Sequence, residues 1–168
     1  MVHYTIKLEE YRAKGKVEVE IPVDEIVSVY ECAPLHLGKT CIPLSRILIG
    51  RNVERSYFVK DTLRNIQSKI TNGFEEYIQT SCSNPDALLS LSLDEFPVFH
   101  ITSDINQHAL VMLPLNRIDH YKNSHKERCI VSINGHEFYI NESRLKLTNI
   151  KGEYESYLIQ IMRNHNVI

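Results

Sequence analysis

Apolar and polar positions alternate strictly over residues 16–23, which places four aliphatic side chains on one face and charged side chains on the other. This alternation is typical of a strand with one buried face. A second strand is predicted over 24–31, followed by a loop or turn over 33–40. Another apolar stretch covers 41–49, where Pro43 has no backbone N–H to donate. Any strand here therefore lies at a sheet edge or begins after Pro43.

The clearest local signal is a β-hairpin around Asn134-Gly135, which separates apolar-rich runs at 129–133 and 136–140. Asn-Gly suits the two positive-φ positions of a type I′ turn, whose twist matches that of paired strands. A two-residue loop also fixes the register of the strands. The predicted pairs are Ile133 with His136, Val131 with Phe138, and Cys129 with Ile140.

Helical spacing of apolar residues marks three segments. Residues 61–72 carry one apolar stripe, which Gly73 interrupts. Asn84-Pro85 supplies an N-cap and a proline suited to the first turn, which predicts a short helix over 85–91. The last segment, over about 152–163, is amphipathic and predicts a helix with one buried face.

Together these patterns predict a single α+β domain over residues 1–168. Its main part is an antiparallel sheet of six to eight strands, including two at 97–101 and 108–113 that a turn connects. A helical insertion occupies about 62–92, and the C-terminal amphipathic helix packs on the sheet. A core is expected, because a chain of ~150 residues hides about 70% of its unfolded surface.

Two stretches of the chain are similar to each other. Residues 22–26, running into Tyr30, resemble residues 114–118, running into Tyr121. Each stretch is followed downstream by a Cys-Ile dipeptide: Cys41-Ile42 and Cys129-Ile130. Short matches of this kind also arise by chance, so both an internal duplication and a coincidence are compatible with the sequence.

The composition is that of an ordinary globular protein, with 43% hydrophobic and 24% charged residues. No apolar run approaches the ~20 residues needed to span a bilayer. The N-terminal residues carry charges where a signal peptide has its apolar stretch. We therefore expect a cytoplasmic protein with reduced cysteines, no membrane contact and no small-molecule cofactor.

No recognised catalytic signature is present. The cysteines lack a reactive context, and the acid pairs are sequence neighbours whose side chains diverge. His100 and His108 lie in apolar stretches, where hydrogen-bonded core histidines are expected. Cys32, His36 and Cys41 could supply three zinc ligands, but their spacing matches no common zinc pattern and a fourth ligand is missing. We therefore expect neither an enzyme nor a metal site.

Charge is unevenly distributed, although the net charge is only −2. Residues 36–72 contain seven basic and two acidic side chains, whereas residues 73–116 contain six acidic side chains and no Lys or Arg. A domain with this distribution could present one positive face, which phosphate binding requires. The alternative is a mixed, solvated surface with accidental clustering.

The candidate phosphate-binding residues form two groups. The first combines cations at gaps of four or five residues with a glycine that lets the backbone approach a ligand closely: Arg46, Gly50, Arg51, Arg55, Lys60 and Arg64. The second lies in the loop before the Asn-Gly hairpin, and loops on a sheet scaffold often carry binding groups: Lys122, His125, Lys126 and Arg128. For both groups the alternative is a set of solvated turn residues.

The residues before and around Gly50 resemble a known family. Residues 33–37 lead to Cys41, and Gly50-Arg51 follows nine and ten residues beyond it. This is similar to the Cys-x(8)-Gly-Arg stretch of ComK, the competence transcription factor family of Gram-positive bacteria. The segment from residue 118 to the C-terminal helix is similar to that family in order and spacing. It also resembles the last strands of LytTR-type DNA-binding domains.

The resemblance implies sequence-specific binding to double-stranded DNA and transcriptional control, with activation of competence as the role of the ComK family. Gly50 and Arg51 match the motif residue by residue, and Arg51 would contact a phosphate or a guanine edge. Residues 62–92 have no counterpart in the family, and its tryptophan is absent here. Its Phe-Pro-Thr element is Leu-Pro-Leu at 113–115. A second copy of the chain is a further candidate partner.

Two other functions remain open. A protein-interaction module or inhibitor would dock a basic partner through the acidic residues 73–116 and would ignore DNA. An enzyme would need a pocket with a perturbed acid, base or thiol. The DNA-binding prediction depends on the convergence in space of the four arginines of the first group: Arg46, Arg51, Arg55 and Arg64.

Overall fold

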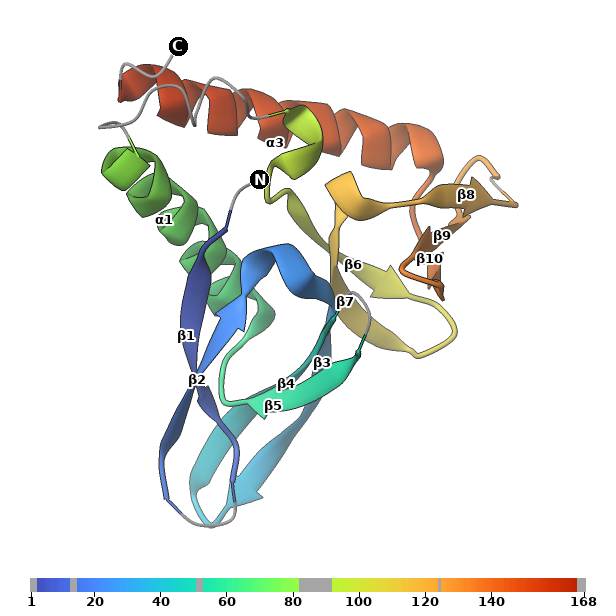
Figure 1. Ribbon diagram of the computed structural model, residues 1–168. Helices are drawn as coiled ribbons and strands as arrows, with labels where there is room; N and C mark the ends of the chain where they lie inside the picture. Colours follow the sequence, from blue (N-terminus) through green and yellow to red (C-terminus); the bar gives the residue numbers. More distant parts are fainter. Residues whose placement is uncertain (1–2, 13–14, 51–52, 82–91, 124, 166–168) are drawn as a thin grey trace.

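The computed structural model describes residues 3–12, 15–50, 53–81, 92–123 and 125–165. It has an α+β fold in which a single ten-stranded antiparallel sheet carries two long helices, α1 (Leu63–Ser81) and α3 (Arg144–Asn164) (Figure 1). The predicted fold class is confirmed, although the sheet has ten strands where six to eight were expected. The helix predicted over 85–91 lies outside the described residues.

The sheet order is β2-β1-β5-β4-β3-β7-β6-β10-β9-β8. Short 3-10 turns, η1 (Val23–Glu25), η2 (Leu93–Glu95) and η3 (Leu115–Arg117), precede β3, β6 and β8. The strands are β1 (Thr5–Glu10), β2 (Val17–Pro22), β3 (Ile26–Leu37), β4 (Thr40–Ile49), β5 (Arg55–Val59), β6 (Phe99–Asp104), β7 (Ala109–Pro114), β8 (His120–Lys122), β9 (Cys129–Ile133) and β10 (His136–Ile140).

The two halves of the sheet have the same architecture. In each half a hairpin ends in a proline, a 3-10 turn follows, and three strands and a long helix complete the unit. The strand order of the first half, β2-β1-β5-β4-β3, is repeated by β7-β6-β10-β9-β8 in the second. The structure therefore confirms the internal duplication that the sequence had left open.

Backbone hydrogen bonds match between the halves at constant offsets. Residues of β1 correspond to residues of β6 that lie 94 positions later, and residues of β5 to those of β10 that lie 81 positions later. Three bonds of the first half each have an equivalent: Val23 N–Tyr4 O and Leu115 N–Val98 O, Lys60 N–Glu9 O and Asn141 N–Ser103 O, Tyr11 N–Phe58 O and Ile105 N–Tyr139 O. This agreement extends the repeat well beyond the short sequence match.

The register corrects the details of the sequence match. Ser45 pairs with Val59 as Cys129 pairs with Ile140, so the next residues, Arg46 and Ile130, are also equivalent. Tyr30 pairs with Arg46, and Lys122 pairs with Ile130. Tyr30 therefore corresponds to Lys122 and not to Tyr121. Ser45 corresponds to Cys129: each donates to the backbone carbonyl of an acidic residue just before a helix, Asp61 and Glu142. The Cys-Ile match at Cys41 was therefore coincidental.

Helix α1 runs through Gly73, where the sequence predicted an interruption. The Tyr4 ring crosses the helix at this point, and an added Cβ on Gly73 would lie 2.6 Å from its Cε2 atom. The Tyr4 hydroxyl donates to the Ile70 carbonyl at 2.6 Å. Gly73 therefore lets β1 pack closely against α1 without ending the helix.

The predicted Asn-Gly hairpin is confirmed, with the expected register between β9 and β10. Asn134 and Gly135 both have positive φ, at 51° and 82°. The loop predicted over 33–40 is instead mostly strand, because β3 continues to Leu37 after a bulge. Pro43 lies within β4, beyond the residues that pair with β5, so no β5 residue needs the backbone N–H that proline lacks.

Candidate functional site

The first group of predicted cations does not share one surface. Arg46 on β4 lies opposite Phe58 on β5, whereas Arg55 lies opposite Ile49. Alternate residues of a strand face opposite sides of the sheet, so Arg46 and Arg55 leave the sheet on different faces. The expectation that these arginines converge is therefore wrong for this pair. Arg51, on which the family motif rests, lies outside the described residues.

The other members of this group have local roles or stand apart. Lys60 forms an ion pair with Glu9 at 3.1 Å. Arg64 is exposed on the first turn of α1. Gly50 is buried with φ +137°, and a Cβ there would lie 2.3 Å from the Val53 carbonyl oxygen. Its own carbonyl accepts a bond from Asn134, so Gly50 fits the contact between the two halves of the sheet.

Arg46 lies in a polar groove of about 720 Å³ between the two halves of the sheet. It is the sole Lys or Arg among the described residues that line the groove. Three carboxylates line it as well: Glu31, Glu54 and Glu137. The groove therefore does not favour phosphate binding, because its local charge is negative.

The thiols near these surfaces are not activated. Burial raises the pKa of Cys32, which the neighbouring Arg46 only partly opposes. Burial also raises the pKa of Cys129, and the Glu142 carboxylate adds to the effect. A nucleophilic cysteine requires a lowered pKa. Among the described residues, no cluster of three His, Cys, Asp or Glu side chains has the arrangement of a metal site.

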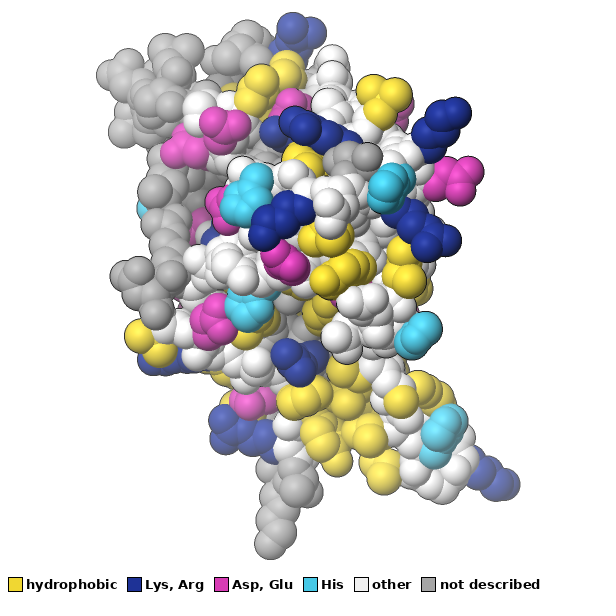
Figure 2. All heavy atoms as spheres, turned by 90° about the vertical axis from the view of Figure 1, so that its right-hand side faces the viewer, with side chains coloured by type: hydrophobic (Ala, Val, Ile, Leu, Met, Phe, Trp, Pro, Cys, Tyr) yellow, Lys and Arg dark blue, Asp and Glu magenta, His cyan; other side chains and the backbone are white. Residues whose placement is uncertain are grey.

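The second predicted group is extended by residues from the start of α3. Lys126 and Arg128 are exposed in the loop between β8 and β9, where His125 N donates to Arg128 O at 2.8 Å. The Arg144 guanidinium lies over the Tyr121 ring of β8, 4.7 Å from its centroid. We name Lys126, Arg128, Arg144 and Lys146 the basic end. Figure 2 shows Lys and Arg side chains gathered over the upper part of this side of the molecule, with acidic side chains between them.

The cations near the basic end differ in how they are paired. Lys122 on β8 pairs with Glu137, and Lys146 pairs with Glu142 at 3.1 Å. Within the described part of the chain, Lys126, Arg128 and Arg144 have no carboxylate partner. These three positive charges are therefore available to an anionic ligand.

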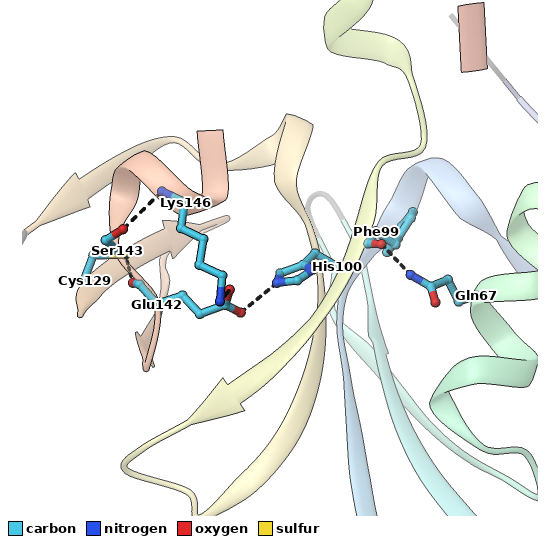
Figure 3. A network of polar contacts seen from close by, with 7 residues as sticks. All are labelled: Gln67, Phe99, His100, Cys129, Glu142, Ser143 and Lys146. Carbon is cyan, nitrogen blue, oxygen red and sulfur yellow. Dashed lines mark hydrogen bonds and ion pairs between the residues drawn. The ribbon is translucent and has the colours of Figure 1, made fainter. Parts of the chain in front are cut away.

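A polar network holds the start of α3 in place (Figure 3). Glu142 accepts from Lys146 and lies 2.7 Å from His100 Nε2 of β6, while its backbone carbonyl accepts from Cys129. Burial alone would raise the Glu142 pKa, but the Thr102 hydroxyl, His100 and Lys146 outweigh it and hold the pKa below its ordinary value. The carboxylate therefore stays charged. His100 is thus a hydrogen-bonded structural residue, as expected, whereas the same prediction is wrong for His108, which is exposed in the turn between β6 and β7.

The hairpin of β3 and β4 extends past β7 and β5, the strands that pair with it, as an arm at the bottom of Figure 1, where the lower ends of β1 and β2 also lie. Strand β7 pairs with β3 at Val29 and Tyr30, and β5 pairs with β4 from Ser45 onward, so residues 31–44 form a two-stranded ribbon. Leu37 near its tip is 58% exposed. Figure 2 shows hydrophobic side chains covering much of this lower projection. Exposed apolar clusters of this kind mark interaction surfaces.

The described acidic residues of the stretch 73–116 differ in burial and in the elements that carry them. Asp104 is buried and accepts from the Tyr30 hydroxyl at 2.6 Å, and Glu75 lies 3.3 Å from His165. Glu76 and Asp94 are exposed on separate elements, α1 and η2. Of the described acidic residues in this stretch, one is therefore a core residue, and the others lie on α1 and η2.

Arg144 and Lys146 were missed by the sequence prediction, because the C-terminal helix was expected to begin near residue 152. Ser143 supplies the signal that could have found them. Its hydroxyl accepts from Lys146 N at 3.1 Å, as expected of an N-cap.

Comparison with protein-family models, with curated proteins and with solved structures found no match to the chain. Among the described residues no helix is long and apolar enough to cross a membrane.

Proposed function

We propose that the chain is a cytoplasmic DNA-binding transcriptional regulator that holds the duplex through the basic end. The observation that supports this most is that cations from two segments distant in the sequence, the β8–β9 loop and the start of α3, lie around β8 at the same end of the sheet. Three of its cations, Lys126, Arg128 and Arg144, have no carboxylate partner among the described residues. The resemblance to ComK and LytTR-type proteins supports the same function.

The basic end suits a phosphate backbone better than the Arg46 groove does. Guanidinium groups bind phosphate in a planar, two-point geometry, and stacking on Tyr121 limits the freedom of Arg144 before any ligand arrives. Phosphate contacts position a protein on duplex DNA and supply most of its affinity for non-specific sites. Base-reading contacts would then come from neighbouring parts of the same surface.

Charge reversal at the basic end tests this function. The affinity for a fluorescently labelled random duplex would be measured by anisotropy, at low salt, for the variants K126E and R128E. Reversal of one phosphate-contacting cation is expected to weaken binding by about tenfold. The matched control is R163E, an equally exposed arginine at the far end of α3. Equal affinities for R128E and R163E, or no binding by the wild type, would refute the proposal.

A protein-interaction module is the second candidate, and the apolar arm favours it. A two-stranded ribbon can enter the major groove of DNA. However, residues 31–44 carry one lysine and one glutamate, so the arm has little attraction for phosphate. The variant L37S tests the role of the arm: unchanged DNA affinity places the arm outside the DNA interface and leaves it for a protein partner, whereas a loss of DNA affinity includes it in the DNA interface.

A further inference from the structure

The two halves of the chain are joined by one strand pair. Val29 of β3 lies opposite Met112 of β7, and Tyr30 lies opposite Val111. The Tyr30 hydroxyl crosses this joint and donates to Asp104 at 2.6 Å. A two-residue antiparallel ladder therefore connects the two halves of the sheet, and side-chain bonds such as those from Tyr30 to Asp104 and from Asn134 to the Gly50 carbonyl also link the repeated units.

The free edges of the sheet are the repeat equivalents of the two strands in this joint. Strand β8 corresponds to β3 and ends the sheet on one side, whereas β2 corresponds to β7 and ends it on the other. Edge strands present unpaired backbone N–H and C=O groups that can template another strand. The chain thus carries on its two edges the two partners of a joint that it already forms internally.

We propose that copies of this chain associate head to tail, with β8 of one copy pairing antiparallel with β2 of the next. The register follows from the internal joint. Residues of β8 lie 92 positions after their equivalents in β3, and residues of β2 lie 92 positions before their equivalents in β7. Tyr121 then lies opposite Glu20 of the next copy, and Lys122 lies opposite Val19. The inference does not depend on DNA binding.

Side-chain charges fit this pairing at the position of the internal bond. Tyr30 corresponds to Lys122, and Asp104 corresponds to Glu10, so the internal Tyr–Asp bond becomes a Lys122–Glu10 ion pair between copies. In the single chain Lys122 pairs with Glu137, and Glu10 with Arg12 at 3.0 Å. Surface ion pairs of this kind exchange at little cost in free energy.

The signs on the two edges also select the mode of association. Strand β2 exposes Glu18 and Glu20, whereas β8 exposes His120 and Lys122. Pairing of like edges would place like charges side by side, which is destabilising. Pairing of unlike edges places Lys122 on the same face as Glu10, and Glu20 on the face where Arg144 lies over Tyr121, so a head-to-tail arrangement is favoured over a symmetric dimer.

The association is expected to be weak and sensitive to salt. Met112 is buried at the internal joint, and its equivalent, Glu20, is exposed and charged. Val29 is likewise buried, and its equivalent, Tyr121, is half-buried. The joint between copies therefore lacks the apolar contribution of the internal one, and ions screen what remains.

Sedimentation velocity over a range of roughly 10 µM to ~1 mM protein tests the inference, because it detects dissociation constants in that range. The wild type at low salt should form species that grow with concentration and revert in high salt. The variants K122E and E10K should each stay monomeric, because like charges then meet at the joint. Equimolar mixing of the two variants should restore association, since a β8 edge from either variant then meets an opposite charge on the β1–β2 edge of the other.

Controls separate the joint from general charge effects. E153K and K39E make the same changes at exposed positions away from both edges, and both should associate as the wild type does. E20K alters an exposed β2 site that lies opposite Tyr121 in this register and should also weaken association, because a cation there would share a face with Arg144; it therefore tests the edge if E10K fails to fold. A wild type that stays monomeric at low salt, or a mixture that fails to associate while both variants are folded, would overturn the inference. K126E and R128E should leave self-association unchanged. A failure of the self-association proposal can therefore be distinguished from a failure of the DNA-binding proposal.

Discussion

Replacement of Tyr30 by phenylalanine tests how the two halves are held together. Tyr30 donates to the buried carboxylate of Asp104 across the β3–β7 joint. The same carboxylate accepts from Asn106 N and Gln107 N at 3.1 and 3.4 Å. Removal of the hydroxyl leaves a buried charge with one donor fewer and makes no new contact.

The expected loss follows from the nature of the bond. A hydrogen bond to a charged group contributes about 1.5–3 kcal/mol. Tyr30 is only half-buried and Asp104 keeps its two backbone donors, so we expect Y30F to lower the free energy of unfolding by about 1–2 kcal/mol. Urea unfolding at neutral pH measures this. Y139F is the matched control, because Tyr139 is 36% exposed and is expected to change by less than ~0.5 kcal/mol.

The pH dependence gives a second readout of the same bond. Burial, and then the bond to Asp104, raise the pKa of Tyr30 above its ordinary value. A raised folded-state pKa contributes stability that is fully present below about pH 10, the unfolded value, and is lost as pH rises toward the folded value. Y30F should therefore lose less stability than the wild type at alkaline pH. A Y30F stability within ~0.5 kcal/mol of the wild type at neutral pH, or an equal alkaline loss, would refute the reasoning.

Three further changes test the local structure. G50A is expected to destabilise the fold by at least ~2 kcal/mol in thermal unfolding, because of positive φ and a clash with Val53, whereas G152A in α3 should stabilise it by up to ~1 kcal/mol. E142Q should remove the stability that the wild type loses as pH falls from about 4.5 through the lowered folded-state pKa of Glu142; an unchanged acid transition would contradict the network. S143A should cost about 1 kcal/mol in chemical denaturation through loss of the α3 cap, and no loss would show that the cap is unimportant.

The sequence predicted most where a local pattern determines the structure. Asn134-Gly135 set the register of β9 and β10, and strict alternation marked β2. Strands β1, β5 and β8 were not predicted: β5 and β8 are short, and the alternation of Ile6 and Leu8 in β1 was overlooked. Because β5 was not predicted, the sequence analysis could not show that Arg46 and Arg55 face opposite sides of the sheet. Once β4 and β5 are paired, the alternation of side chains along each strand requires this orientation.

The candidate surface depended on contacts that no local pattern contains. Lys126 and Arg128 were identified from the basic loop, but Arg144 joins them only because β9, β10 and the Glu142 network bring the start of α3 back to β8. The duplication was visible in residues 22–26 and 114–118, yet its extent became clear only from the repeated strand order. Charge and hydrogen bonding have diverged between the halves, while the backbone pattern is retained.

The salt dependence of DNA binding tests the proposed function most directly. If the four cations of the basic end contact phosphates, log K should fall against log salt with a slope of about −3 to −4, at roughly −0.9 per contact. R128E should reduce the magnitude of that slope by about one, and R163E should leave it unchanged. A duplex affinity that does not vary with salt, or a slope unchanged in R128E, would contradict the assignment of the basic end as the DNA-binding surface.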